Sequence, residues 1–300
     1  MDSILTNKFD IYENKSLNKN IKGIIHISHG MAEHIKRYEW LTHKLNSDGF
    51  HVISIDHRGH GTWIKRGEIP GYFNRTDGWK TVVDDLEELI TITNNKYPNI
   101  KQYLLGHSMG SYVALSLIQR KVKLNGLILT GSSFISLNLI RLQKLIIQIE
   151  TFLKKEQGIS DILDTMIIKS FNNYFKPNRT PKDWISTDEE NVDNYVNDPL
   201  CGFKVTNNIW KNLADGLLTV FNQKCYKLTN ISLPILIISG EKDPVGSNGQ
   251  GPKKLRLFLS NIFNNVDAMI IKNCRHEVFS DIDKDIIYNS FLKFIKQPND

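Results

Sequence analysis

Short apolar runs alternate with amphipathic helical segments along much of this 300-residue chain, and this alternation limits the folds that are open to it. The runs are six or seven residues long and rich in Ile and Leu. Strands of this near-continuous apolar character suit a parallel sheet that helices cover on both faces. The pattern therefore predicts an α/β fold with a mostly parallel, doubly wound sheet. Its predicted strands span residues 23–29, 51–56, 102–107, 126–132, 234–240 and 267–272.

Helical periodicity fills the gaps between several of these strands, and one further strand is predicted near the N-terminus. Residues 8–14, KFDIYEN, predict a strand that pairs at one edge of the sheet. The helices that connect the predicted strands span residues 34–49, 76–97 and 109–121. Helices between successive parallel strands are the connections that a doubly wound sheet requires.

The alternation stops between residues 133 and 229, where helical patterns follow one another without a strand between them. These patterns span residues 137–155, 159–175 and 207–227. Because the insertion follows the C-terminal end of a strand, it would cover the sheet edge at which open α/β proteins bind ligands. We therefore expect a core of residues 1–132 and 230–300, with residues 133–229 inserted in it as a helical cap.

Charge and cysteine content exclude several classes of protein. The net charge of +6 is modest and the lysines are spread along the chain, so no dense basic block indicates nucleic-acid binding. Cys201, Cys225 and Cys274 are odd in number and lack CxxC spacing, which favours reduced thiols over a disulfide framework or a zinc site. The histidine clusters HISH and HRGH lack accompanying ligands at recognisable spacing, so we predict no metal. Without a signal-peptide pattern or a membrane-spanning run, a cytoplasmic location is expected.

The segment Gly106-His107-Ser108-Met109-Gly110 stands where a predicted strand meets a predicted helix. A Gly-x-Ser-x-Gly sequence at such a junction is typical of a nucleophile elbow, a sharp turn that exposes the serine hydroxyl. Glycine on both sides removes the Cβ atoms that would collide with neighbouring backbone, and it tolerates unusual dihedral angles. The pentapeptide in this setting therefore predicts that Ser108 is a nucleophile.

A serine hydroxyl is a weak nucleophile unless a base takes its proton, and histidine held by a carboxylate is the usual base. Of the nine histidines, only His276 follows Ser108, and it lies in the loop after the last predicted strand. The preceding strand is followed by two candidate acids, Glu241 and Asp243. Asp243 lies further out and precedes Pro244, which restricts its backbone to extended or turn geometry. We predict a triad of Ser108, Asp243 and His276, with Glu241 as the alternative acid.

An oxyanion hole would complete such a site, because two backbone N–H groups must face the negative charge that develops on the substrate. One is expected from Met109, the residue after the nucleophile, and the other from the loop after an early strand. That loop begins at His29-Gly30, so Met31 is the predicted second donor.

Six segments in order resemble one family: HGMAEHIKRY, DHRGHG, GYFNRTDGW, GHSMGS, SGEKDPVG and CRHEVF. Together they are similar to the monoacylglycerol lipase and lysophospholipase group of α/β-hydrolases, the serine aminopeptidase-like family. The resemblance runs from about residue 23 to the C-terminus and includes DPLCGF in the expected cap. It implies an α/β-hydrolase fold, a Ser-His-Asp esterase that needs no cofactor, and a cap that lines an acyl-chain tunnel.

The resemblance also implies that Glu33 and Arg37 shape or line the polar end of the substrate site, with a structural ion pair as the alternative. Two departures from the family pattern stand out: Trp63 in GHGTW, and a divergent cap. Because the cap sets the choice of substrate, the acyl length and the leaving group stay open.

The sequence is compatible with four functions. The leading hypothesis is a serine hydrolase of small lipid esters, monoacylglycerols or lysophospholipids, whose cap makes transient contact with a membrane surface. A carboxylesterase of short esters would use the same triad with a smaller pocket. An aminopeptidase would need acidic groups to hold a substrate amine, and residues 186–198 are acidic. The fourth is a binding protein that keeps the fold without catalysis. The oligomeric state stays open.

Overall fold

A single sheet of eight strands organises the computed structural model, which describes residues 2–5 and 8–296. The strand order is β1-β2-β4-β3-β5-β6-β7-β8. The pairs from β4 to β8 are all parallel, while β1 and β2 pair in antiparallel fashion at one end. The strands are β1 (Asp2–Leu5), β2 (Asp10–Asn14), β3 (Gly23–Ser28), β4 (Phe50–Ser54), β5 (Gln102–His107), β6 (Gly126–Thr130), β7 (Ile235–Gly240) and β8 (Val266–Ile271).

The six predicted parallel strands are confirmed, each within two residues of its expected bounds. The reason is that β3 to β7 are buried along their whole length, so their sequences read as uninterrupted apolar runs. The N-terminal strand differs from its expectation. β2 does pair with β4, but β1 pairs on its other side and forms the sheet edge.

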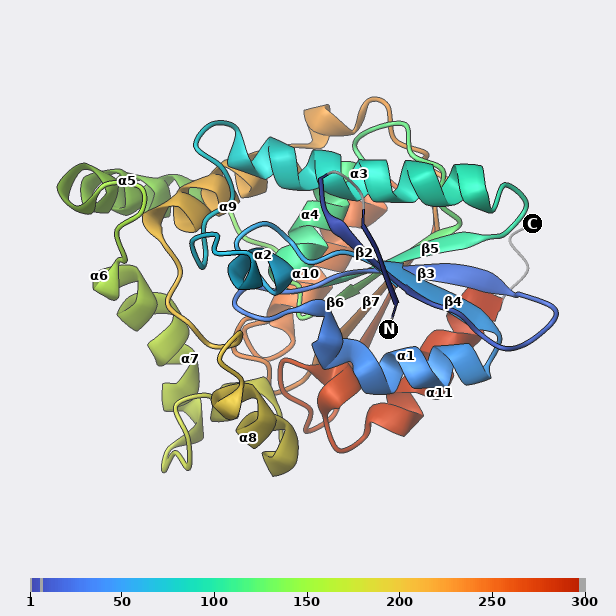
Figure 1. Ribbon diagram of the computed structural model, residues 1–300. Coiled ribbons are helices and arrows are strands. Elements are labelled where there is room, and N and C mark those ends of the chain that lie inside the picture. Colours follow the sequence, from blue (N-terminus) through green and yellow to red (C-terminus); the bar gives the residue numbers. More distant parts are fainter. Residues whose placement is uncertain (1, 6–7, 297–300) are drawn as a thin grey trace.

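Helices cover both faces of the sheet, as a doubly wound fold requires (Figure 1). Two apolar clusters fill the spaces between the sheet and these helices. On one face lie α1 (Glu39–Ser47) and α11 (Lys284–Lys296). On the other lie α3 (Gly78–Lys96), α4 (Met109–Leu117) and α10 (Gln250–Ser260), while the short α2 (Thr62–Lys65) follows β4.

The chain between β6 and β7 consists of helices joined by loops and lies beyond one end of the sheet (Figure 1). It contains α5 (Leu137–Lys154), α6 (Asp161–Leu163), α7 (Ser170–Asn172), α8 (Glu189–Asn197) and α9 (Asn207–Val220). The single helix expected over residues 159–175 is instead α6, a π-helical stretch Asp164–Lys169, α7 and a 3-10 turn Asn173–Phe175. The division into a core and a cap at residues 133 and 229 stays a prediction, and α9 packs directly on α3 and α4.

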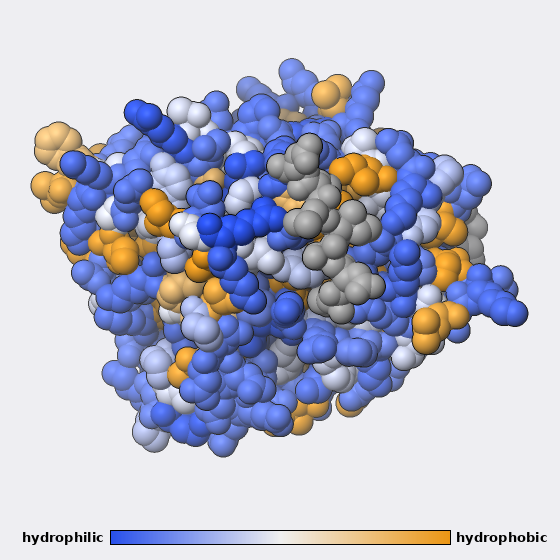
Figure 2. Space-filling model, viewed as in Figure 1, coloured by the Kyte–Doolittle hydropathy of each residue, from blue (hydrophilic) through white to orange (hydrophobic). Residues whose placement is uncertain are grey.

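The outer face of α5 exposes a row of large apolar side chains. Hydrophobic residues gather at the left end of the view in Figure 2, where α5 lies in Figure 1. They include Leu142, Leu145, Ile149, Phe152 and Leu153. Contact of this surface with a membrane stays a prediction. Within residues 2–5 and 8–296, none of the helices combines the length and apolar character that crossing a bilayer demands.

Candidate active site

Ser108 lies on the strained turn that the sequence predicts. Its φ of 50° and ψ of −121° fall outside the regions that L-residues usually adopt. The turn is held from both sides: Ser108 N–H donates to Thr130 O at 2.8 Å, and Ser111 N–H donates to Ser108 O at 3.0 Å. The strain is therefore fixed by β6 and by the first turn of α4.

Glycine is required at both flanking positions because other backbone comes too close. A Cβ atom on Gly110 would lie 2.0 Å from Ser28 O, and one on Gly106 would lie 2.7 Å from the Cα atom of Ser111. Real Cβ atoms essentially never approach other atoms below 3.0 Å. The Gly-x-Ser-x-Gly pattern is thus explained by the packing of the elbow against β3.

His276 and Asp243 meet beyond the ends of β8 and β7. His276 Nδ1 lies 3.0 Å from Asp243 Oδ2, and both side chains are buried. The other Asp243 oxygen accepts a hydrogen bond from Val245 N–H at 2.9 Å, which fixes the carboxylate. Glu241 instead accepts from the backbone N–H of Asn273 at 3.2 Å, and it is exposed. The structure therefore brings Asp243, and not Glu241, to the imidazole.

Ser108 and His276 line the same cavity, which has a volume of about 580 Å³. Among the described residues no hydrogen bond joins Ser108 Oγ to His276. In unliganded sites such catalytic hydrogen bonds are often long and tighten only with substrate bound. Transfer of a proton from Ser108 to His276 stays a prediction.

The environment of His276 favours its protonated form. Burial lowers the pKa of His276, but the charge and hydrogen bond of Asp243 outweigh burial, so that pKa lies above 6.5. Trp184 and His107 flank the imidazole, with ring centroids 4.9 Å and 4.7 Å from it. The sequence did not single out Trp184, because it lies outside the segments that resemble the family.

The loop after β3 approaches the nucleophile where an oxyanion hole is expected. A Cβ atom on Gly30 would lie 3.3 Å from the Ser108 Cβ, and Met31 and Met109 both line the cavity. Met109 is the first residue of α4, where a backbone N–H has no acceptor within the helix. Ala32, at φ 55°, follows in the same loop. Both predicted donors thus lie beside Ser108, and their role stays a prediction.

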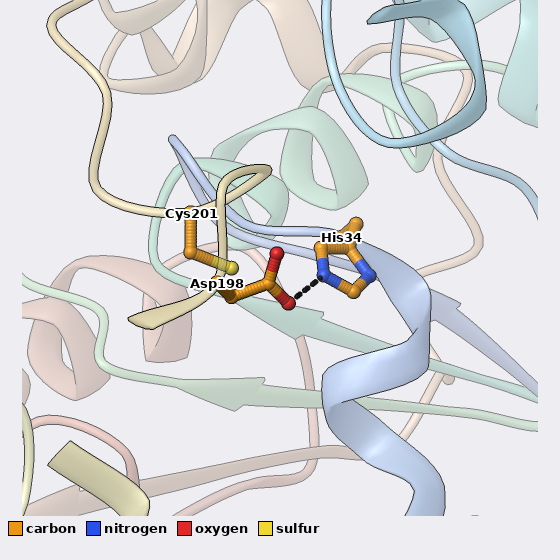
Figure 3. Close-up of side chains that lie close together, drawn as sticks. All are labelled: His34, Asp198 and Cys201. Atoms are coloured by element: carbon orange, nitrogen blue, oxygen red, sulfur yellow. Dashed lines mark hydrogen bonds and ion pairs between the residues drawn. The ribbon is translucent and has the colours of Figure 1, made fainter. Parts of the chain in front are cut away.

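Contacts with the helical insertion hold this loop in place. Ala32 O accepts hydrogen bonds from Tyr195 Oη and Gly202 N, both at 2.9 Å. His34 Nε2 and Asp198 Oδ2 lie 2.8 Å apart, and the three side chains of His34, Asp198 and Cys201 point toward one another (Figure 3). Burial raises the pKa of the Cys201 thiol, which keeps it protonated. This cluster therefore connects the loop after β3 to residues 198–201.

Glu33 and Arg37 belong to a buried charge cluster with Glu277. Arg37 Nη2 donates to Glu277 Oε2 at 2.5 Å, and Arg37 Nε lies 3.7 Å from Glu33 Oε2. Burial and the charge of Glu277 raise the pKa of Glu33 to about 7. Glu33 lines the cavity, whereas Arg37 is absent from its lining and packs on the Tyr195 ring at 4.8 Å. These contacts favour the structural ion pair, and a substrate role for either residue stays a prediction.

Replacing Arg37 with Met is expected to lower the free energy of unfolding by about 3–5 kcal/mol, because the buried carboxylate of Glu277 would lose its cationic partner. Urea denaturation measures this loss. A matched control is Lys80→Met, which removes an exposed ion pair with Asp84 and should cost at most about 1 kcal/mol. A loss below 1 kcal/mol for Arg37→Met would show that the cluster contributes little to stability.

A second buried group beneath the site consists of His29, His57 and His60. His29 Nε2 accepts a hydrogen bond from the backbone N–H of His57 at 2.9 Å, and the ring centroids of His29 and His57 lie 4.5 Å apart. Burial lowers the pKa of His29 to about 4 and that of His60 to about 3, and it holds the pKa of His57 well below 6.5. These imidazoles are therefore neutral in the folded protein at neutral pH.

Stability is expected to fall between pH 6.5 and pH 5. Below 6.5 the unfolded chain binds protons at these histidines and the folded chain does not, so each costs about 1.4 kcal/mol per pH unit. Glu33 and His276, whose pKa values are raised, act in the opposite direction, whereas buried His26 and His107, whose pKa values burial lowers, add to the loss. Urea denaturation at pH 7 and pH 5 should show a net loss of a few kcal/mol. The exposed His43 supplies the control, since His43→Gln should leave the slope unchanged. A flat profile would contradict burial of neutral histidines.

The chain is similar to several known proteins. A family model described as serine aminopeptidase, S33, matches residues 19–283. The monoacylglycerol lipase of Mycolicibacterium smegmatis is 22% identical over 282 residues, which cover 91% of this chain and 88% of that protein. The monoglyceride lipase of Rattus norvegicus is 26% identical over 230 residues, which cover 74% and 65%.

Solved structures extend the likeness to the whole fold. A thermostable carboxyl esterase from Bacillus coagulans, solved with glycerol, has a TM-score of 0.87 at 26% identity and covers 98% of this chain and 96% of that one. A monoglyceride lipase from Saccharomyces cerevisiae has a TM-score of 0.77 at 16% identity, with 98% and 94% covered, which shows the fold alone. Since the family model spans the elbow, the acid and the histidine, the chain belongs to the serine aminopeptidase S33 family of α/β-hydrolases.

Proposed function

We propose that this protein hydrolyses carboxylic esters of lipids, with monoacylglycerols or lysophospholipids as substrates. The observation that carries the proposal is the buried pair His276–Asp243 facing the same apolar cavity as Ser108 on its strained turn. Relatives named as monoacylglycerol and monoglyceride lipases support an ester of this class.

The reaction would run through an acyl-enzyme. Ser108 Oγ attacks the ester carbonyl while His276 takes its proton, and Asp243 holds the imidazole and stabilises its charged form. The N–H groups of Met31 and Met109 hold the oxyanion of the tetrahedral intermediate. His276 then gives the proton to the leaving alcohol, and water, activated by the same histidine, releases the fatty acid.

The lining of the cavity supports an acyl chain as the bound group. Away from Ser108 its walls are mostly apolar, which suits a hydrocarbon chain. The residues there include Phe134, Ile147, Leu163, Ile167, Trp210 and Leu217. A volume of about 580 Å³ lies within the range of ligand pockets for molecules larger than a short ester.

An aminopeptidase reaction is less well supported. Of the acids that line the cavity, Glu33 and Glu277 are paired with Arg37, and Asp164 lies 3.8 Å from Lys169 Nζ, so each already faces a cation. In the acidic segment 186–198, Asp188 caps α8 and Glu189 is exposed. That segment therefore serves as a solvated helix rather than as an amine site.

Hydrolysis of glycerol and p-nitrophenyl esters from short to long acyl chains tests the proposal. The expected result is a rise in kcat/KM from acetyl to medium or long chains, since each CH₂ buried in the cavity contributes up to about 0.8 kcal/mol. Aminoacyl arylamides should be hydrolysed far more slowly than esters. A steady fall in activity with chain length would instead assign the protein to short-chain carboxylesterases.

A further inference from the structure

The proposed reaction assigns no role to the ammonium group of Lys182. It lies just before the 3-10 turn Asp183–Ile185, and its side chain is partly buried and lines the same cavity as Ser108. The backbone at this point is fixed on both sides: Lys182 N–H donates to Thr180 Oγ1, and Ile185 N–H donates to Lys182 O, each at 3.1 Å. The ammonium group is thus presented from a rigid turn.

The same turn carries the ring that packs on the catalytic imidazole. Trp184, two residues after Lys182, has its ring 4.9 Å from that of His276. On the other side, a Cβ atom on Gly202 would lie 3.5 Å from Lys182 Cε, and Gly202 N–H is bonded to Ala32 O in the oxyanion loop. The end of the lysine stem therefore lies beside Gly202, which is bonded to the loop that follows Met31.

No group within residues 2–5 and 8–296 forms a hydrogen bond or ion pair with Lys182 Nζ. Burial lowers the pKa of Lys182, and the charge of Asp164 opposes that shift. Asp164 itself lies 3.8 Å from Lys169 Nζ, and the acids Glu33 and Glu277 are paired with Arg37. A partly buried cation without a direct partner favours an anion in the cavity.

We propose that Lys182 binds a phosphate on the alcohol side of the ester, so that the protein prefers acylglycerol phosphates to neutral monoacylglycerols. The assignment to the alcohol side is part of this proposal: Lys182 lies two residues from Trp184, whose ring packs on His276, and His276 must pass its proton to the leaving alcohol. A lysine ammonium suits a phosphate as a compact point charge. The inference rests on the proposed ester hydrolysis.

Two substrates that differ only by the phosphate test this inference: 1-decanoylglycerol and 1-decanoylglycerol 3-phosphate, below their micellar concentrations and in phosphate-free buffer. For the unmodified protein the ratio of kcat/KM, phosphorylated over neutral, should exceed one. Lys182→Met should lower that ratio about 10-fold to 100-fold, the range for one hydrogen bond to a charged group. Lys182→Arg keeps the charge and should restore most of the ratio.

Lys254 provides the matched control, because it also lines the cavity but is exposed on α10. One helical turn further on, Phe258 packs on Phe134 of the apolar wall with ring centroids 5.6 Å apart. Lys254→Met removes the same charge from another part of the cavity lining and should change the ratio by less than twofold. An equal fall for both variants would show a general effect of charge and overturn the specific role of Lys182.

Other outcomes separate this inference from the proposed function. If both esters are hydrolysed at a ratio near one, or if Lys182→Met lowers both rates equally, the phosphate site is wrong while ester hydrolysis stands. If neither ester is hydrolysed, the proposed function itself fails. As a binding readout, sn-glycerol 3-phosphate should inhibit hydrolysis of the neutral ester more strongly than glycerol or inorganic phosphate does. Equal inhibition by inorganic phosphate would overturn recognition of the phosphorylated alcohol.

Discussion

Replacing Ser108 with Ala is expected to lower kcat for ester hydrolysis by a factor of about 10⁴ to 10⁶, since losing the nucleophile of such a triad costs about this much. The fold should survive, because the hydrogen bonds that hold the elbow use the backbone N–H and O of residue 108 rather than its hydroxyl. Binding of the ester should change little, so KM should stay within a few-fold.

The measurement compares steady-state hydrolysis of p-nitrophenyl decanoate by the two proteins, with urea denaturation to confirm folding. Ser290→Ala is the matched control: it removes a half-buried hydroxyl on α11 that bonds Ile286 O and does not line the cavity, so it should leave kcat unchanged. Residual activity above about one per cent in a folded Ser108→Ala protein would mean that another group attacks the ester.

Replacing Asp243 with Asn is expected to lower kcat by a factor of about 10⁴, because the amide would hold the wrong tautomer of His276 and would not stabilise its charged form. Asp243 also raises the pKa of His276. Removing its charge should therefore move the acidic limb of the kcat/KM profile toward lower pH, since the base stays neutral down to a lower pH.

Glu241→Gln is the natural comparison, because Glu241 is the other acid of the same loop and bonds only a backbone N–H. It should lower kcat by less than tenfold and leave the pH profile in place. If Glu241→Gln were the more damaging change, the acid would be Glu241 and the geometry at His276 would be misassigned. Equal, small effects of both variants would argue against any carboxylate acting on the imidazole.

The sequence predicted the sheet and the elbow well because both leave strong local signals. Buried parallel strands must be apolar along their whole length, and the close approach of Gly110 to Ser28 O admits only glycine. The triad followed from chain order, since a single histidine lies downstream of Ser108. The meeting of His276 and Asp243 agrees with that prediction, whereas their chemical roles stay predictions until tested.

Features made by long-range packing were not predictable in the same way. The segment 159–175 has helical periodicity, yet it forms a π-helical stretch between two short helices. The periodicity of apolar residues predicts a helix but does not distinguish a π-helical stretch from an α-helix. The turn that carries Trp184 is bonded across about ninety residues, since Arg275 Nη1 donates to the carbonyls of Asp183 and Ser186, and local sequence does not encode such contacts. The pairing of Arg37 with Glu277 likewise depends on the tertiary fold.

Labelling with a fluorophosphonate tests the central claim most directly, because the probe reacts covalently only with a serine that a neighbouring base activates. The account predicts one adduct per chain, located by peptide mass spectrometry at Ser108, absent from Ser108→Ala and greatly slowed in His276→Gln. No adduct on the folded protein, or an adduct at another serine, would contradict the claim that Ser108 is the activated nucleophile.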